Sequence, residues 1–411
     1  GFSWEYSPGI FIDHSDVTIE NVIIRNNNGG MNIFSYGGGI LCRNSVINIS
    51  NSTIQDNSAF FHGGGIDLHM SISKLINVNV IGNQATVGGG VHINGSDVAI
   101  VGGNIKDNKA FIHGGGICIT SSNTTIDNVF ISGNIASPLA SLEPVSPFDI
   151  DEGIGGGMSL YSSSPIIRNT TFANNIADLG GAIRCENNSY PQIVNSILCN
   201  NSPTEIDIVD SSYTDTMNST IKISYSNIQG GEEGIINNGN SIVNWLDNNI
   251  DADPQFSNPE TGDFTLQVTS PCIDQGDPNP WFNDIDFSRS DMGATGGSFL
   301  QPSFKEYNFG EVGNFPTKVY WNFSNYRETP VTIDNVSFST NTFYTDAIFP
   351  VVIEPIKNEV IPIICLPDGL GQINDSMVIE STDLANGASV SLSVQGVGGN
   401  VLNGNLSGTY P

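Results

Sequence analysis

Six copies of a glycine-rich phrase recur through the first half of the chain, each followed by an apolar residue. The intervals between their first glycines are 26, 25, 26, 41 and 25 residues, so the period is about 25 with one insertion. The copies begin at Gly37, Gly63, Gly88, Gly114, Gly155 and Gly180. A fixed period of this length is typical of repeat architectures, in which each unit buries its apolar face against its neighbours.

Each repeat carries strand patterns and no helix pattern. Apolar residues alternate with other residues directly after each glycine phrase, as at 66–68 and 91–93, and a second alternating stretch follows, as at 47–49. Alternation with a period of two indicates β-strands. Three short strands and three turns in about 25 residues predict an all-β fold, a right-handed single-stranded parallel β-helix with one coil per repeat.

Two columns of asparagine keep the same period. The first is predicted to be a structural ladder and comprises Asn27, Asn57, Asn83, Asn108, Asn134, Asn175 and Asn201. The second lies six residues ahead of it and comprises Asn21, Asn51, Asn77, Asn128, Asn169 and Asn195. Asparagine tolerates left-handed backbone at tight bends, and its amide can donate to one coil while accepting from the next. We expect these columns to satisfy polar groups that the bends bury.

The repeat pattern sets the domain boundaries. It predicts the parallel β-helix over residues 1–250 and an irregular C-terminal cap over 251–303, because the exposed end of a β-helix is a sheet edge that needs covering. Short strand patterns then predict an immunoglobulin-like β-sandwich over 304–398. Residues 399–411, rich in glycine, asparagine and serine, are interpreted as a linker to a further region.

The charge balance excludes some partners. The chain has 13 Lys and Arg against 42 Asp and Glu, a net charge of −29, so it repels nucleic acid and anionic membrane surfaces. No apolar stretch is long enough to span a bilayer, so direct membrane insertion is not expected. The six cysteines are expected to be free thiols. The chain opens in the middle of the repeat pattern, which suggests a fragment of a larger secreted protein.

The β-helix register places polar residues of the first strand on its outward face. Two groups of candidate catalytic side chains follow from it: Asp67, His69 and His92 on adjacent coils, and Tyr161, Arg184 and Glu186 on later ones. A general base beside an acid is what polysaccharide cleavage requires. The alternative, which we favour, is a solvated polar face without catalytic function, because half of the outward residues are unreactive and cations are few.

The insertion in the fourth interval is a candidate binding loop. It runs over residues 136–153, and its acidic side chains Asp149, Asp151 and Glu152 lead into the strand that carries Tyr161. Long loops on repeat scaffolds often hold a binding function. A surface excursion without function is the alternative.

Two further patterns bear on metal binding. His62 and His113 recur just before glycine phrases, which we interpret as an echo of the repeat. A loop-rich acidic stretch offers oxygen ligands for Ca²⁺ at Asp274, Asp277, Asp284, Asp286 and Asp291. Turns in which Asp and Asn bond their own backbone explain the same residues. Calcium is therefore the one cofactor considered, and none is required by the predicted fold.

The motifs at 171–175 and 180–183, Thr-Phe-Ala-Asn-Asn and Gly-Gly-Ala-Ile, resemble the FxxN and GGA[I/L/V] repeats of chlamydial polymorphic outer membrane proteins. That resemblance covers roughly residues 10–230 and implies a parallel β-helix and a surface adhesin. Most copies in this chain have another residue in place of the alanine.

Later motifs carry a second resemblance. Asp-Pro-Gln-Phe at 253–256, Ser-Pro-Cys-Ile-Asp at 270–274 and Asp-Met-Gly-Ala at 291–294 resemble the ends of bacterial surface β-helix proteins with choice-of-anchor domains. The region from 304 is similar to the ASPM/SPD-2/hydin class of immunoglobulin-like domains. Both resemblances imply a large secreted bacterial protein.

We therefore expect an extracellular or cell-surface bacterial β-solenoid with an adhesive or structural role. Its expected partners are a host or neighbouring-cell surface, glycans, or other copies of itself. The alternative is a polysaccharide-active enzyme, a lyase or glycoside hydrolase, or a glycan-binding module on the outer face of the β-helix.

Overall fold

The computed structural model describes residues 8–29, 36–137, 152–209 and 218–397. These residues are almost entirely β-structure and turns, and their helices are short 3₁₀ turns at Glu232–Gly234, Pro259–Thr261 and Pro280–Phe282. The chain divides into two compact units. The first comprises Gly1–Pro278, Phe282–Asp284 and Ser288–Gly297, and the second comprises Asn279–Trp281, Ile285–Phe287 and Ser298–Pro411. None of the helices in this described part has the length and apolar character of a membrane span.

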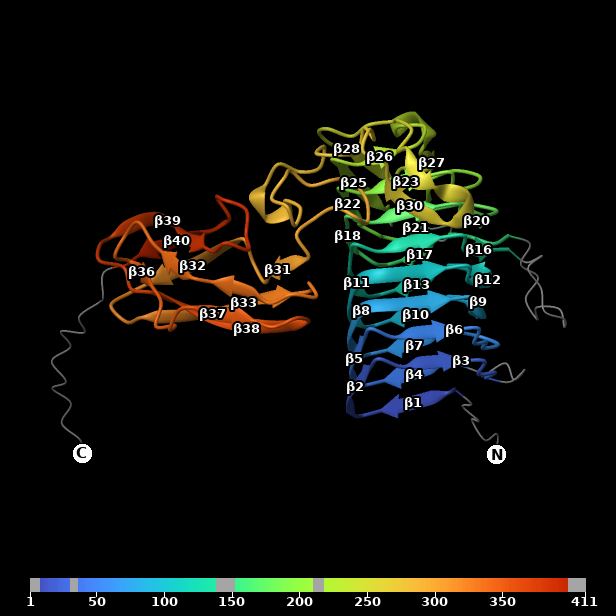
Figure 1. The fold of residues 1–411 in the computed structure, drawn as a ribbon, viewed down its shortest axis with the longest axis horizontal. Helices are drawn as coiled ribbons and strands as arrows, with labels where there is room; N and C mark the ends of the chain where they lie inside the picture. The colour runs from blue at the N-terminus through green and yellow to red at the C-terminus, as the bar shows by residue number, and fades with distance from the viewer. Residues whose placement is uncertain (1–7, 30–35, 138–151, 210–217, 398–411) are drawn as a thin grey trace, which may run out of the picture. The chain divides into compact units, whose positions relative to one another are not determined.

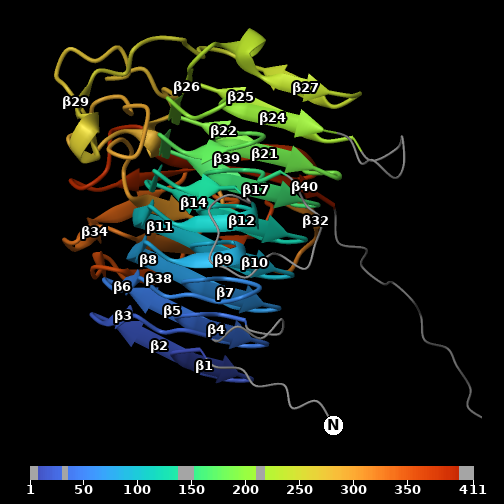
Figure 2. The same cartoon turned by 90° about the vertical axis from the view of Figure 1, so that its right-hand side faces the viewer.

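The first unit is a parallel β-solenoid of about eight turns over residues 10–245, which confirms the parallel β-helix that the repeats predict. One strand of each turn enters a nine-stranded sheet, visible as a stack of arrows in Figures 1 and 2. In spatial order its members are β1 (Ile10–Asp13), β4 (Ile40–Arg43), β7 (Ile66–His69), β10 (Val91–Asn94), β13 (Ile117–Thr120), β17 (Met158–Tyr161), β21 (Ile183–Glu186), β24 (Ile206–Val209) and β27 (Ile236–Asn238).

The other strands of each turn form two further parallel sheets. In the larger, β8 (Ile72–Ile81) and β11 (Asp97–Lys106) run round one corner of the coil and pair with strands on both sides of it. The remaining members are β2 (Asp16–Glu20), β3 (Ile23–Arg25), β5 (Val46–Ser50), β6 (Thr53–Gln55), β14 (Asn123–Asp127), β15 (Phe130–Ser132), β18 (Ile166–Arg168), β19 (Thr171–Ala173), β22 (Gln192–Val194), β23 (Ile197–Cys199), β25 (Thr220–Ser224), β26 (Asn227–Ile228) and β28 (Ile242–Trp245). The smaller holds β9 (Gln84–Val87), β12 (Lys109–His113), β16 (Ile135–Ala136) and β20 (Ile176–Ala177).

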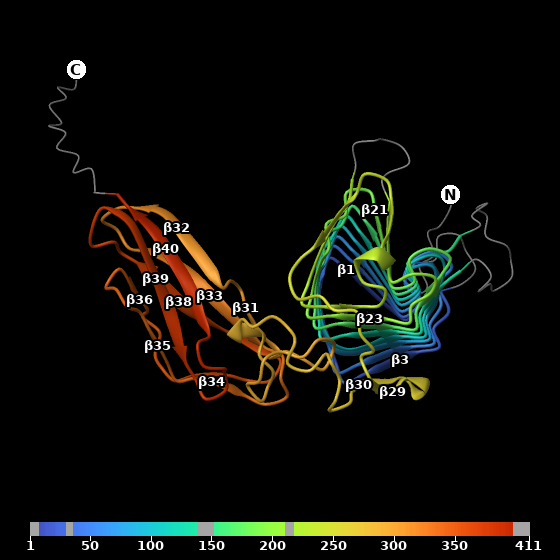
Figure 3. The same ribbon diagram turned by 90° about the horizontal axis from the view of Figure 1, so that it is seen from above.

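Successive turns lie over one another in register, as Figure 3 shows. Val91 pairs with Ile66 on one side and Ile117 on the other, so equivalent residues of the repeat are vertical neighbours. The inward side chains form one hydrophobic core that reaches from Ile12 to Ile235. Burial of each large aliphatic side chain contributes roughly 1.5–3 kcal/mol. The six cysteines are buried and free, as predicted.

The asparagine column from Asn27 to Asn201 forms a continuous hydrogen-bonded ladder inside the solenoid. At each step the backbone N–H and the side-chain Nδ2 of one asparagine donate to Oδ1 of the next, and for Asn83 and Asn108 these distances are 2.9 and 3.0 Å. Nδ2 of Asn108 also donates to the carbonyl oxygen of Val80. The same pair of hydrogen bonds to Oδ1 joins all the remaining steps of the ladder. Each ladder amide between the two end residues therefore has partners in the turns on both sides, which avoids the cost of buried unsatisfied groups.

The left-handed backbone conformation falls outside the ladder. Asn51 and Asn195 of the other asparagine column have φ angles of 48° and 53°, and Tyr225 takes over this position with a φ of 50°. Asp107, which directly precedes a ladder asparagine, is also left-handed, with a φ of 58°. Among the described residues with positive φ, none is a ladder asparagine. The bends and the ladder are therefore separate positions, whereas the sequence analysis assigned both properties to the asparagines together.

A ladder of serines, which the sequence analysis did not predict, lines another corner of the coil. The backbone N–H of Ser71 donates to Oγ of Ser96, and that of Ser96 donates to Oγ of Ser122, each at 3.0 Å. The ladder comprises Ser45, Ser71, Ser96, Ser122, Ser163, Ser189, Ser219 and Ser241. Its signal in the sequence is a serine that recurs shortly after each first strand.

Each glycine phrase folds a turn over the strand that follows it. Gly63 is left-handed with a φ of 60°, and a Cβ at Gly64 would collide with the carbonyl oxygens of Gln84 and Gly89. Gly63 also lies directly against the Cβ of Asp67. This turn buries the first outward position of the strands, where the sequence analysis expected a solvated face. The buried column comprises Leu41, Asp67, His92, Cys118, Ser159, Arg184 and Asp207.

The segment after the last turn packs against the side of the solenoid. Its hairpin of β29 (Phe256–Asn258) and β30 (Asp263–Leu266) shares an apolar cluster with the outward residues Ala173, Ile197 and Cys199. Asn195 accepts from the backbone N–H of Asp277 at 2.7 Å. The sequence analysis expected this segment to cover the end of the β-helix, and these contacts are with its lateral face.

The second unit contains two four-stranded sheets around one hydrophobic core. The first holds β31 (Leu300–Pro302), β33 (Thr317–Asn325), β38 (Lys357–Cys365) and β36 (Phe343–Tyr344), and the second holds β32 (Glu306–Val312), β40 (Ser389–Gly396), β39 (Gly371–Glu380) and β35 (Asn335–Ser337). β34 (Val331–Ile333) and β37 (Val351–Ile353) form a separate pair. The expected boundary at 304 differs from the structure, because β31 already pairs with β33. The predicted linker at 399–411 lies outside the described residues.

Substitution of one central ladder residue tests how far the stack depends on it. Asn108→Ala leaves the N–H and Nδ2 of Asn83 and the carbonyl of Val80 without their buried partner. We expect a loss of about 3 kcal/mol or more in the free energy of unfolding, measured by urea denaturation. The control Asn123→Ala removes an exposed asparagine from the neighbouring turn and is expected to cost less than about 0.5 kcal/mol. Equal midpoints for both variants would contradict the ladder's role.

The ladder ends on a carboxyl group, which predicts a pH dependence. Asn201 donates its N–H to Oε1 of Glu205 and its Nδ2 to Oε2. Burial raises the pKa of Glu205 to about 7, and the bonds from Asn201 oppose this only in part. A raised pKa in the folded state means that the stabilisation is present below the ordinary value of 4.5 and is lost as the pH rises through about 7.

The variant Glu205→Gln isolates this contribution, because the amide does not titrate. From pH 5 to pH 8 we expect the unfolding free energy of the wild type to fall relative to that of the variant by up to about 3 kcal/mol. Urea denaturation at each pH measures the difference. Parallel pH profiles for the two proteins would contradict the prediction.

Candidate functional site

The structure brings Asp67, His69 and His92 together, as the register predicts. Asp67 and His69 lie on β7, and His92 lies on β10 in the next turn, paired with Asp67. Oδ1 of Asp67 is 2.7 Å from Nδ1 of His92 and 2.9 Å from Nε2 of His69. The side chain of Asp67 is 0% exposed, that of His92 is 3% exposed and that of His69 is 24% exposed. Only His69 therefore faces the solvent to any extent.

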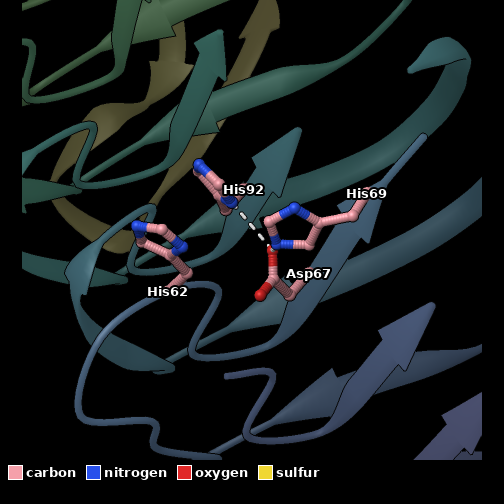
Figure 4. A group of neighbouring side chains, drawn as sticks. All are labelled: His62, Asp67, His69 and His92. Carbon is pink, nitrogen blue, oxygen red and sulfur yellow. Dashed lines mark hydrogen bonds and ion pairs between the residues drawn. The ribbon is translucent and has the colours of Figure 1, made fainter. Parts of the chain in front are cut away.

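His62 joins this group, although the sequence analysis interpreted it as an echo of the repeat. Its ring stacks on that of His92 with centroids 4.1 Å apart. One potential ligand atom from each of His62, Asp67, His69 and His92 lies within 4.8 Å of the others, and Figure 4 shows the four side chains converging. We call these four residues the histidine–aspartate cluster. The 25-residue period predicts the position of His62 along the coil. It does not predict the direction in which the turn before Gly63 folds, so the sequence did not place His62 in the cluster.

The electrostatics of the cluster follow from burial and proximity. Burial acts to raise the pKa of Asp67, but the charge of His92 and the hydrogen bonds from His69 and His92 lower it below its usual value. Burial acts to lower the pKa of His69, but its hydrogen bond to Asp67 and the charge of that carboxylate raise it above the usual value. For His62, burial together with the charge of His92 lowers the pKa to about 3. The cluster therefore combines an ionised carboxylate with a neutral His62.

A surface hollow opens beside the cluster. Its volume is about 330 Å³, and it is lined by Tyr36, Leu41, Arg43, Asn44, His62, His69 and Met70. Tyr36 stands one turn from His62 and pairs with it in a parallel bridge, with ring centroids 5.3 Å apart. Tyr36 was also missed by the sequence analysis. An aromatic ring, a guanidinium and an imidazole therefore border one small opening.

The second predicted group is divided by the structure. Arg184 is buried, with Nε 3.0 Å from Oε1 of Glu186 and Nη1 2.6 Å from Oδ2 of Asp207. Burial raises the pKa of Asp207, and Arg184 partly offsets this. Tyr161 stands in register beside Glu186, but its side chain is 45% exposed. Arg184 and Asp207 thus form a buried ion pair, and Tyr161 lies on the surface above it.

The acidic stretch proposed for calcium uses several of its carboxylates in other ways. Asp284 accepts from the backbone N–H groups of Asp291 and Gly297, and Oδ1 of Asp291 accepts from that of Asp274. Asp277 bonds Asn195 through its backbone, and Asp286 belongs to the second unit. In the described ranges, the histidine–aspartate cluster is the one group of three or more His, Cys, Asp or Glu side chains that are close enough together to share a metal ion. Calcium binding at the acidic stretch stays a prediction.

The candidate binding loop lies mostly outside the described residues. Asp149 and Asp151 fall there, and Glu152 is described and exposed. The insertion leaves the register of the flanking turns intact, because Cys118 pairs directly with Ser159 across it.

Comparison with known proteins assigns little of the chain. The sequence profile of a domain of unknown function, DUF5123, matches residues 165–281, which span the last turns of the solenoid and part of the segment against its side. No curated protein matches the chain.

Some solved structures resemble about a quarter of the chain. They include a protein of unknown function from Porphyromonas gingivalis W83 (14% identity, TM-score 0.21, 23% of this chain and 46% of that one). Another is the VesB protease of Vibrio cholerae (10% identity, TM-score 0.20, 24% of this chain and 32% of that one). A third is the ASH/PapD-like domain 7 of human CEP192 (13% identity, TM-score 0.22, 25% of this chain and 87% of that one). This chain spans less than two thirds of the first two. These TM-scores are low, so the likenesses assign neither a fold nor a function.

The buried ion pair makes a prediction about stability. Arg184→Met leaves the carboxylate of Asp207 buried without its cation, which we expect to cost about 3–5 kcal/mol in urea denaturation. The double variant with Asp207→Leu removes both charges and is expected to recover a large part of this loss. Arg25→Met, at an exposed arginine of β3, is the control and should change stability by less than about 0.5 kcal/mol. A single and a double variant of equal stability would contradict the pairing.

Proposed function

We propose that this chain is part of a secreted or cell-surface bacterial β-solenoid with an adhesive or structural role. One observation carries the proposal: three of the six candidate catalytic side chains, Asp67, His92 and Arg184, are buried beneath the turns. Asp67 and His92 are buried by the turns that precede their strands, and Arg184 is buried against Asp207. A general acid or base must reach the glycosidic oxygen or a ring proton of its substrate, and these groups do not reach the surface.

The composition supports the same role. A net charge of −29 keeps a long stack soluble and repels nucleic acid and anionic membrane surfaces. The partners that we propose are a host or neighbouring-cell surface, glycans, or further copies of this chain. Calcium at the acidic stretch after residue 273 remains compatible with this role, because Ca²⁺ prefers oxygen ligands.

The finer identity of the fold belongs to the same proposal. We assign the solenoid to right-handed β-helices with repeats like those of polymorphic outer membrane proteins, since parallel strand connections are overwhelmingly right-handed. We assign the second unit to immunoglobulin-like sandwiches of the ASPM/SPD-2/hydin class. Its two four-stranded sheets with a shared core that contains Trp321 and Phe323 support that assignment.

A glycan-binding or polysaccharide-active surface is the second candidate, and the hollow beside the cluster favours it. Tyr36 offers an aromatic ring, and Arg43 and Asn44 offer hydrogen-bonding groups. Two residues of the cluster, His62 and His69, also line the hollow, and the side chain of His69 is 24% exposed. Such a combination can hold a sugar through stacking and a few polar contacts.

A combined screen separates the two candidates. The purified full chain is tested on a glycan array and against acidic and neutral polysaccharides, with released product measured. We expect no product, because Asp67, His92 and Arg184 are buried and leave neither candidate group complete at the surface. Any glycan retained at the hollow should be lost in Tyr36→Ala and Arg43→Ala and kept in the control Arg25→Ala, whose arginine is exposed on β3. Product release that disappears on substitution of His92 and Tyr161 would overturn the non-catalytic role.

A further inference from the structure

Two buried polar atoms of the histidine–aspartate cluster have no hydrogen-bond partner. They are Nδ1 of His62 and Oδ2 of Asp67, and both are shielded from solvent. Leaving such a donor or acceptor unsatisfied costs about 1–3 kcal/mol, and more for a charged group. Native proteins keep few such groups, and a site for a bound ion is one of the ordinary reasons for them. The cluster is therefore incomplete as a set of hydrogen bonds.

The donor set indicates which ion would complete it. Three imidazole nitrogens and one carboxylate oxygen are ligands that Zn²⁺ and neighbouring divalent transition metals prefer, whereas Ca²⁺ and Mg²⁺ prefer oxygen alone. Four protein ligands fill a tetrahedral zinc site, as in structural rather than catalytic centres. We propose that His62, Asp67, His69 and His92 form a binding site for a divalent transition metal of the zinc class.

The ligand atoms lie close to the separations of such a site. Tetrahedral zinc holds its ligand atoms about 3.3 Å apart, given bonds of about 2.0–2.1 Å. Asp67 already lies at 2.7 Å from His92 and 2.9 Å from His69, and all four ligand atoms lie within 4.8 Å of one another. Each imidazole nitrogen that faces Oδ1 gives up its proton when it binds the cation: a neutral ring carries the proton on its other nitrogen instead, and a protonated ring releases one proton to solvent. Side-chain rotations that widen the two contacts of Asp67 and shorten the longer separations bring the set to the bound geometry.

The position of the site determines what the metal does. His62 belongs to the turn before Gly63, Asp67 and His69 belong to β7, and His92 belongs to the next coil on β10. The ion therefore joins a turn, a strand and a neighbouring coil, and it stabilises the stack where the buried column is charged. The hollow lined by Tyr36, Arg43 and His69 gives it a path from solvent. This inference does not depend on the proposed adhesive role.

The test uses the full chain stripped of metal by a chelator. Calorimetric titration with Zn²⁺ is expected to show one tight site that excess Ca²⁺ does not displace, since calcium binds oxygen-rich sites. Co²⁺, used as a spectroscopic probe, is expected to give the intense visible absorption of tetrahedral nitrogen coordination. Zinc is also expected to raise the midpoint of thermal unfolding.

Matched variants locate the site. His69→Gln at the rim and His62→Gln in the turn should each weaken zinc binding by more than about tenfold, since even indirect ligand partners cost that much. His113→Gln is the control: it removes the histidine at the corresponding place before a glycine phrase, outside the cluster, and should keep wild-type affinity.

Binding of equal strength in the wild type and both cluster variants would overturn the proposal. So would a wild type that takes up neither Zn²⁺ nor Co²⁺, or one whose cobalt spectrum shows oxygen coordination only. The cobalt spectrum of the wild type decides the matter even where a variant fails to fold.

Discussion

Hydrogen bonding between successive turns, in register, is the constraint on which the rest of the structure depends. Each strand pairs with its repeat equivalent, so every turn must return the chain to the same place. At corners where strand pairing is interrupted, side chains provide the hydrogen bonds between turns. The asparagine ladder does so at one corner and the serine ladder at another. The long fourth interval obeys the same rule, since the added residues leave the pairing of Ile131 with Phe172 unchanged. Length variation is therefore confined to loops, and the core keeps a constant cross-section.

Exact stacking also decides which side chains meet. In the column beneath the glycine turns three of the seven positions, Leu41, Cys118 and Ser159, are neutral, and the other four are ionisable. At two heights the column is charged, and at each of them the partner comes from an adjacent coil: His92 for Asp67 and Asp207 for Arg184. Burying one charge alone is costly, so a departure from the apolar repeat at one height requires a matching departure at the next. Each of the two charged groups therefore needs residues from two adjacent coils.

The sequence carries the fold and part of the site, for physical reasons that particular residues illustrate. The 25-residue period determines vertical neighbours, so the proximity of Asp67, His69 and His92 could be predicted. Their burial could not, because it depends on the turn before Gly63, whose path follows from close backbone contacts rather than from periodicity. The same turn brings His62 to the cluster. The serine ladder could not be predicted from the sequence, because serine is also common in ordinary turns. Docking of the segment after the last turn on the side of the solenoid rests on contacts such as the hydrogen bond from the backbone N–H of Asp277 to Oδ1 of Asn195, which no repeat pattern encodes.

The two charged groups differ in a way that explains their different expected roles. Arg184 brings a permanent positive charge to the buried carboxylate of Asp207 and also contacts the partly exposed Glu186, so the buried carboxylate of this group has a side-chain cation as its partner. The carboxylate of Asp67 faces imidazoles, which supply a full positive charge only when they are protonated. Both groups keep buried atoms without a hydrogen-bond partner, Oδ2 of Asp67 and Nδ1 of His62 in the first and Oδ1 of Asp207 in the second, so the difference between them lies in the available positive charge. Repeat stability is approximately a sum over neighbouring coils, so an uncompensated charge at one interface weakens the stack at that height. A bound cation supplies the missing charge and links the same elements, which is why metal binding is inferred for the first group and not for the second.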